Sequence, residues 1–186
     1  MYTLPAIQDP NTGKSVVGSS AIAQYLDSTY PETPRVIPEG TEAFHEALQA
    51  AFDSVFMPTL AYLIMPIAYE NVLNDASKVH FKAAREKVVG GDMAIWSPAE
   101  SDTRAKQWVA LEKAFGKIAG WLDAAGKQRQ FFMRDRVSFA DFILGARLIW
   151  MKRTLGKDSD EWRKVAGWHG GRWAKFLEAL PQESLA

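Results

Sequence analysis

The 186-residue sequence contains no cysteine, and neither charge is in excess, because 22 Lys and Arg residues balance 22 Asp and Glu residues. The missing cysteine excludes disulfides, thiolate metal sites and a cysteine nucleophile, and it favours a reducing, cytoplasmic location. A chain without net charge has no global field that would attract nucleic acid or an anionic membrane. We therefore predict neither of these as a partner.

The sequence also lacks long hydrophobic runs and common ligand-binding motifs. No run approaches the ~20 apolar residues of a membrane-spanning helix, and the N-terminus has no signal-peptide pattern. The GxGxxG, P-loop and HExxH motifs are absent, and His45, His80 and His169 are too scattered for metal-ligand spacing. We therefore expect no metal and no nucleotide cofactor. With 47% hydrophobic residues, the chain can still bury a sizeable core.

The first part of the sequence predicts a small β-β-α unit. Residues 2–7 form a short β-like run, and the turn-forming residues 9–13 lead into a second short run at 14–17. Ser19 and Ser20 follow and can cap a helix. The pattern therefore predicts a hairpin and one helix.

A proline-rich stretch, residues 31–40, separates this unit from the rest of the chain. We place the domain boundary there. Residues 1–32 form the first unit, residues 33–40 form a linker, and residues 41–186 form an all-α domain.

Hydrophobic periodicity predicts the first helices of the second domain. Apolar residues recur at three- and four-residue spacing from Phe44 to Phe56, and Pro58 and Pro66 are expected to kink or divide this helix. A polar helix over residues 77–89 is expected on the outside, ending at Gly90.

Two serine motifs predict the starts of later helices. Ser97-Pro98-Ala99-Glu100 should open a long helix that carries an apolar face over residues 108–122. Ser138-Phe139-Ala140-Asp141 is a second capping box and should open a buried helix. Two shorter helices, over residues 160–166 and 171–180, complete the predicted bundle.

Three of these features occur in an order that resembles a glutathione transferase: Leu4-Pro5-Ala6-Ile7, then Ser19-Ser20-Ala21-Ile22-Ala23-Gln24-Tyr25-Leu26, then a helical domain containing Ser138-Phe139-Ala140-Asp141. The resemblance covers nearly the whole chain, and residues 3–31 are most similar to the fungal etherase-like and nitrogen-regulator-like groups. It implies a mostly α fold, in which a partial thioredoxin-like α/β unit precedes an all-α C-terminal bundle. In that family ~50 to 60 residues precede this proline as a βαβ unit that bears the catalytic serine, tyrosine or cysteine. The resemblance therefore implies that this part is lacking, and it assigns no catalytic residue.

The resemblance also implies a glutathione site in the first unit. A cis proline at position 5 would turn the backbone of Leu4 outward, where it could pair with the cysteinyl part of glutathione. Ser19 and Ser20 would lie at a helix N-terminus, where amides and the helix dipole favour the γ-glutamyl carboxylate. Many relatives have an acidic residue just before this serine, which receives the ammonium group of glutathione, whereas this sequence has Gly18.

A hydrophobic second substrate would lie against the first long helix, so Phe52, Phe56 and Tyr62 are candidates for its site. The alternative is core packing, which is typical of aromatic residues at helical spacing. We interpret Ser138 and Asp141 as a structural capping pair. The cluster of three tryptophans near the end of the chain is expected to pack the last helices: Trp162, Trp168 and Trp173.

Three functional hypotheses follow from these patterns. The first is an enzyme of detoxification that conjugates glutathione to a small hydrophobic electrophile or cleaves such a molecule with it. The second is a non-catalytic ligand-binding or regulatory protein, and the third is a truncated form of a longer transferase. A homodimer is expected, because a residual two-stranded hairpin would expose edge amides and an apolar face.

Overall fold

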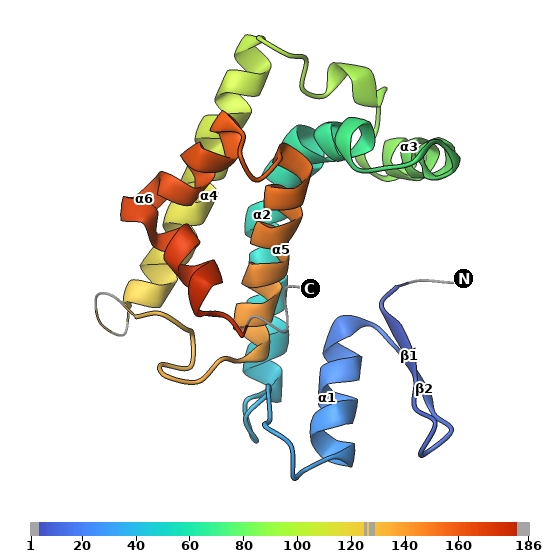
Figure 1. Cartoon of the computed structure of the whole chain (residues 1–186), viewed down its shortest axis with the longest axis vertical. Helices are drawn as coiled ribbons and strands as arrows, with labels where there is room; N and C mark the ends of the chain where they lie inside the picture. The colour runs from blue at the N-terminus through green and yellow to red at the C-terminus, as the bar shows by residue number, and fades with distance from the viewer. Residues whose placement is uncertain (1–3, 125, 127–128, 182–186) are drawn as a thin grey trace.

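The computed structural model describes residues 4–124, 126 and 129–181. In chain order the described elements are β1 (Ala6–Gln8), β2 (Ser15–Val17), α1 (Ser19–Thr29), α2 (Glu42–Asn71), α3 (Asp75–Val89), the 3-10 helix η1 (Met93–Ile95), α4 (Asp102–Asp123), α5 (Phe139–Leu155) and α6 (Asp160–Ala179). Figure 1 shows the hairpin and α1 on one side of the central α2 and α5, with α4 and α6 on the other side. The predicted mostly helical fold with a β-β-α start is confirmed.

The hairpin pairs two short antiparallel strands, with Ala6 opposite Val17. Two backbone hydrogen bonds of Asp9 close its turn: Asp9 N donates to Lys14 O at 2.8 Å, and Gly13 N donates to Asp9 O at 2.8 Å. The predicted strand residues 2 and 3 lie outside the described residues.

The predicted serine cap of α1 is wrong. The N-cap residue is Gly18, and no side chain accepts a capping hydrogen bond, because Ser19 and Ser20 already belong to the first helical turn. Gly18 has a φ of 95°, in a region that glycine enters without steric cost. This conformation lets the chain turn from β2 directly into α1.

The central helix α2 runs through both of its prolines, Pro58 and Pro66, and neither divides it. It therefore joins shorter apolar runs into one helix. Among the helices of the described residues, α2 is the one whose length and apolar composition would allow it to cross a membrane. Phe52, Phe56 and Leu60 of this helix are buried in one cluster with side chains of α4 and α5. This is how a core helix of a bundle packs.

The helix predicted to begin after Ser97 starts one turn later than expected. The N-cap of α4 is Ser101, whose Oγ accepts a hydrogen bond from Arg104 N at 3.1 Å. Glu100 has a φ of 57°, which breaks any helix that would start at Ser97. The predicted apolar face of α4 is buried: Trp108, Leu111, Phe115, Ile118 and Leu122.

The capping box of α5 is confirmed. Ser138 donates to Asp141 Oδ2 from its backbone N at 2.8 Å and from its Oγ at 2.7 Å, and Phe132 N donates to Oδ1 at 3.0 Å. Burial raises the pKa of Asp141, while these hydrogen bonds favour the charged form and act against the rise. The pair is therefore structural and also fixes the loop before α5.

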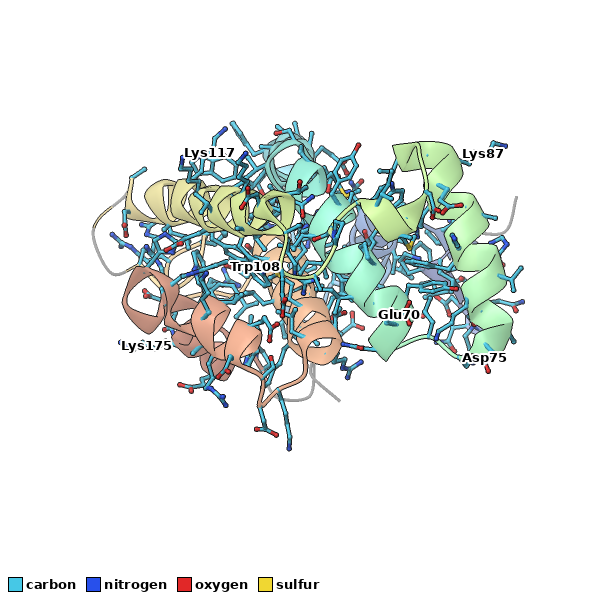
Figure 2. The ribbon with its side chains drawn as sticks, turned by 90° about the horizontal axis from the view of Figure 1, so that it is seen from above. Glu70, Asp75, Lys87, Trp108, Lys117 and Lys175 are labelled. Atoms are coloured by element: carbon cyan, nitrogen blue, oxygen red, sulfur yellow. The ribbon has the colours of Figure 1, made fainter. Side chains whose placement is uncertain are left out.

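The remaining helices lie as the sequence pattern predicted. α3 has no buried residue and packs outside the bundle, as Figure 2 shows for the segment that begins at Asp75. α6 consists of two helical segments that meet at a non-helical break, Trp168–Gly171. The three predicted tryptophans are buried between helices: Trp162, Trp168 and Trp173.

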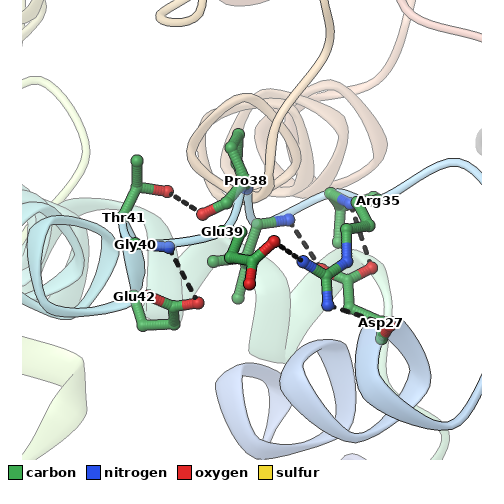
Figure 3. A network of polar contacts seen from close by, with 9 residues as sticks. Asp27, Arg35, Pro38, Glu39, Gly40, Thr41 and Glu42 are labelled. Atoms are coloured by element: carbon green, nitrogen blue, oxygen red, sulfur yellow. Dashed lines mark hydrogen bonds and ion pairs between the residues drawn. The ribbon is translucent and has the colours of Figure 1, made fainter. Parts of the chain in front are cut away.

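The linker is held by one buried carboxylate of α1, that of Asp27 (Figure 3). Its Oδ1 accepts a hydrogen bond from Val36 N at 3.1 Å, and its Oδ2 accepts one from Ile37 N at 2.8 Å. On the other side, Phe139 N of α5 donates to Val36 O at 2.8 Å. Asp27 thus connects α1, through two linker residues, to the start of α5.

Candidate functional site

The end of the hairpin brings together residues that the sequence separates. Gly18 N donates to Pro5 O at 2.9 Å, which extends the pairing of Ala6 with Val17 by one step. The Leu4–Pro5 peptide bond is cis. The side chain of Leu4 is 88% exposed, and Ser19, which follows Gly18, is exposed as well. The predicted residues Leu4, Pro5 and Ser19 therefore share one open end of the β-β-α unit.

The same end carries the N-terminus of α1. The first backbone N–H groups of a helix have no partner within it, and the helix dipole places partial positive charge there. No acidic residue lies in the first turn of α1 to occupy these groups. Exposed Ser19 adds a hydroxyl beside them. This turn can therefore bind a carboxylate.

A carboxylate from the helical domain stands beside this turn. Glu46 of α2 accepts a hydrogen bond from Ser20 Oγ, and Gln24 Nε2 donates to the same Glu46 oxygen at 3.0 Å. Gln24 Nε2 also donates to Ser20 Oγ at 3.2 Å. Ser20 is thus placed at the first turn with its hydroxyl bonded to Glu46. The sequence analysis missed Glu46, because no local motif distinguishes it from other acidic residues of a helix.

The three features define what this end of the unit can do chemically. An exposed strand end offers backbone groups to an extended peptide, and a helix N-terminus offers donors to an anion. Glu46 offers an acceptor to a cation. A short peptide with a carboxylate and an ammonium group at one end matches this set of partners.

The scaffold behind the site is held by Asp9, a buried carboxylate at the hairpin turn. Tyr25 OH donates to Asp9 Oδ2 at 2.6 Å, Tyr30 OH donates to the same oxygen at 2.7 Å, and Asn11 N donates to Oδ1 at 2.8 Å. The hydrogen bond from Tyr25, followed by that from Tyr30, lowers the pKa of Asp9 to about 2. The ionised carboxylate therefore ties the hairpin turn to the C-terminal half of α1.

Of the candidates for a hydrophobic substrate site, Phe52 and Phe56 contact each other, whereas Tyr62 has a different aromatic partner. Phe52 and Phe56 are 0% exposed. Their rings stack on each other with centroids 6.1 Å apart, and the Arg147 guanidinium lies over both. Tyr62 is 38% exposed and meets Trp96 edge-to-face at 5.7 Å. Phe52 and Phe56 are thus buried in the core, and Tyr62 is the exposed member of the set. The substrate role stays a prediction.

Polar side chains of α6 have structural partners. Trp173 Nε1 donates to His169 Nδ1 at 3.0 Å, and Arg172 donates to Ala119 O at 3.2 Å and to Arg129 O at 3.0 Å. Among the described residues, no group of three or more His, Asp or Glu side chains is arranged to hold a metal ion.

Fold and site together define a protein class: a β-β-α unit with a cis proline, followed by an all-α bundle with a capping box. Comparison with models of known sequence families identifies the same class. The glutathione S-transferase C-terminal domain model matches residues 43–182, and the N-terminal domain model matches residues 1–34. The chain belongs to the glutathione S-transferase family.

Solved structures of fungal glutathione transferases resemble the chain over 95–100% of its length. CsGST63524 of Ceriporiopsis subvermispora, in complex with glutathione, is 43% identical with a TM-score of 0.94, and the match covers 100% of this chain and 72% of that one. CsGST83044 of the same fungus, also with glutathione, is 41% identical with a TM-score of 0.88, over 95% and 70% of the two chains. GSTFuA3 of Phanerochaete chrysosporium is 37% identical with a TM-score of 0.85, over 96% and 69%. A search of curated proteins gave no match. The subgroup within the family stays a prediction.

Proposed function

We propose that the chain binds glutathione at the open end of the β-β-α unit and uses it as a transferase on a small hydrophobic electrophile. The observation that carries the proposal is the hydrogen bond from Gly18 N to Pro5 O at 2.9 Å. This bond joins Pro5, the residue after the exposed Leu4, to Gly18, the N-cap of α1, and so supports a site that uses both. Two similar transferases were crystallised with glutathione, which supports the choice of ligand.

Each part of glutathione has a counterpart in this arrangement. The cysteinyl backbone pairs with Leu4 as a short added strand. The γ-glutamyl carboxylate binds the first-turn amides of α1 and the Ser19 hydroxyl. The γ-glutamyl ammonium lies against Glu46, which supplies the acidic group that Gly18 cannot. In turnover the glutathione thiolate forms a carbon–sulfur bond with the electrophile, and the leaving group departs with its electron pair.

Calorimetric titration of the 186-residue chain with glutathione tests the binding. Ser19→Ala removes a hydrogen bond to a carboxylate, about 1.5–3 kcal/mol, and should weaken binding roughly 10- to 100-fold. Ser28→Ala, at the other end of α1, is the matched control and should leave the affinity unchanged. Absence of binding at millimolar glutathione would refute the proposal.

Glu46→Gln tests the ammonium partner separately. The pair is solvent-exposed and contributes about 0.2–1 kcal/mol, so we expect glutathione binding to weaken by a factor of roughly 1.4 to 5. An analogue in which a glutaryl group replaces the γ-glutamyl group lacks the ammonium. The substitution should leave the affinity for this analogue unchanged. Equal losses for both ligands would contradict the role of Glu46.

Turnover is measured with an aryl halide as the electrophile. Formation of the glutathione conjugate above the uncatalysed rate, and its loss in Ser19→Ala at subsaturating glutathione, would support the enzyme. Glutathione binding without conjugation would favour the ligand-binding alternative for this chain.

We also propose a homodimer and a cytoplasmic location. The two-stranded hairpin keeps an unpaired edge and leaves Val17 51% exposed, which a second copy could cover. Sedimentation at low micromolar concentration tests the dimer, and a single monomeric species would contradict it. The absence of cysteine supports the location.

A further inference from the structure

Gln24 connects the β-β-α unit to the helical domain at the candidate glutathione site. It lies on α1 four residues after Ser20, so both side chains are on the same face of the helix. Gln24 Nε2 donates to Ser20 Oγ at 3.2 Å and to Glu46 Oε1 of α2 at 3.0 Å, and Ser20 Oγ donates to the same Glu46 oxygen. The three side chains thus form a closed set of hydrogen bonds where α1 faces the first part of α2 (Figure 1).

The chemistry of these groups fixes which atom donates in each hydrogen bond. A carboxylate only accepts, so the amide nitrogen of Gln24, rather than its oxygen, must face Glu46. The Ser20 hydroxyl has a single hydrogen, which goes to Glu46, and its oxygen accepts from Gln24. Ser20 therefore has no hydrogen left for a ligand carboxylate. It serves the site by holding Glu46, and the exposed Ser19 supplies the hydroxyl for the ligand.

Both donors reach one oxygen of Glu46 and leave the other open. Among the described residues, no hydrogen bond reaches Glu46 Oε2, and no ion pair involves this carboxylate. Neither α1 nor α2 contains Lys or Arg, and Glu42 adds a negative charge one turn earlier on α2. Glu46 Oε2 therefore attracts a cation, and the γ-glutamyl ammonium of glutathione is such a cation.

Gln24 and Ser20 determine the orientation of this carboxylate. Glu46 is exposed, so without these donors its side chain could adopt several rotamers. Holding it in one position removes part of the entropy that binding an ammonium would otherwise cost. The effect concerns the ammonium alone, because the other parts of the ligand bind the α1 amides, Ser19 and Leu4 in the proposed arrangement. A ligand without an ammonium should therefore not depend on Gln24.

We propose that Gln24 is a positioning residue, which holds Glu46 Oε2 toward the ligand and makes the site select γ-glutamyl compounds with a free α-amino group. This inference rests on the proposed glutathione site and gives a source of its selectivity. Compounds in which the α-amino group is acylated or missing are bound less tightly for this reason.

The test measures the ratio of the affinities for glutathione and for its glutaryl analogue, by calorimetric titration of the 186-residue chain with each. The unmodified chain should prefer glutathione by a factor of roughly 1.4 to 5, the range for an exposed ion pair. Gln24→Met keeps the length of the side chain and removes its donors. It should weaken glutathione binding about twofold, within that range, and leave analogue binding unchanged.

Two further variants and a control separate positioning from structure. Gln24→Lys directs a cation of the chain itself at Glu46, so the ratio should fall to about 1. Adding Gln24→Met to Glu46→Gln should cause no further loss, because Gln24 acts through Glu46. Ser28→Met is the control, since Ser28 is exposed on the same face one turn further along α1, and it should leave the ratio unchanged. Thermal unfolding shows that each variant is folded.

Three outcomes would overturn this inference while the glutathione site stands: a ratio that Gln24→Met leaves unchanged, equal losses for both ligands, or a further loss in the double variant. Equal losses would show that Gln24 supports only the structure of α1. If neither ligand binds at millimolar concentration, the proposed glutathione site fails, and this inference fails with it.

Discussion

Asp27→Ala should loosen the attachment of the β-β-α unit to the helical domain. The carboxylate of Asp27 accepts hydrogen bonds from Val36 N at 3.1 Å and Ile37 N at 2.8 Å. Ile37 is 2% exposed, so water cannot readily replace the second bond, whereas the half-buried Val36 amide can recover part of the first. Each hydrogen bond to a charged group contributes about 1.5–3 kcal/mol. We expect a loss of about 3 kcal/mol in the free energy of unfolding.

Urea and thermal unfolding measure this loss. For a chain of this size, 1 kcal/mol corresponds to about 2–4 °C in the midpoint, so a decrease of roughly 6–12 °C is expected. Hydrogen exchange should accelerate at the amides of Val36 and Ile37. Glutathione affinity should also fall, because α1 carries Ser19.

Glu32→Ala is the control for this experiment, since Glu32 is an exposed acidic residue close to the same linker. It should unfold as the unmodified chain does. A loss below about 1 kcal/mol in Asp27→Ala, or unchanged protection of the two amides, would show that other contacts hold the linker and would refute the reasoning.

Two further predictions concern buried carboxylates. Asp141→Ala removes the acceptor of the α5 capping box and should lower the free energy of unfolding by about 2–4 kcal/mol in urea titrations, whereas Asp135→Ala at an exposed position should not. The hydrogen bonds from Tyr25 and Tyr30 lower the pKa of Asp9 from 3.8 to about 2. The stability due to Asp9 is therefore fully present above about pH 4 and is lost as the pH falls through about 2. Thermal midpoints measured across this range should fall in the unmodified chain and change less in Asp9→Asn; equal slopes would contradict the assignment.

Much of the fold could be predicted because its signals are local. The period of apolar residues along α4 and the reciprocal capping pair Ser138 and Asp141 each arise within a few residues of the chain. The first residues of the helices were harder to predict, because several serines lie at positions where each could cap the same helix. The choice between Ser97 and Ser101 depends on the left-handed conformation of Glu100, which no local pattern reports.

The candidate site was predictable only in part. Leu4, Pro5 and Ser19 could be named from a family resemblance, and the hairpin register places them together. Glu46 could not be named, because its contact with Ser20 joins residues 26 positions apart on two helices. For Phe52 and Phe56, periodicity cannot say whether an apolar face meets a ligand or another helix, and packing against α4 and α5 buries them.

The sequence by itself indicated the class of protein through the resemblance of three ordered motifs to a known family. It also determined the order of the main elements and placed a serine at the start of α1, since these depend on short patterns along the chain. The tertiary structure alone decided which distant polar groups meet: Glu46 with Ser20 at the first turn of α1, and Asp27 with the linker amides of Val36 and Ile37. The physical reason is that hydrogen bonds and ion pairs act over a few ångströms in space. The separation of two residues along the chain does not tell whether their side chains come this close in space.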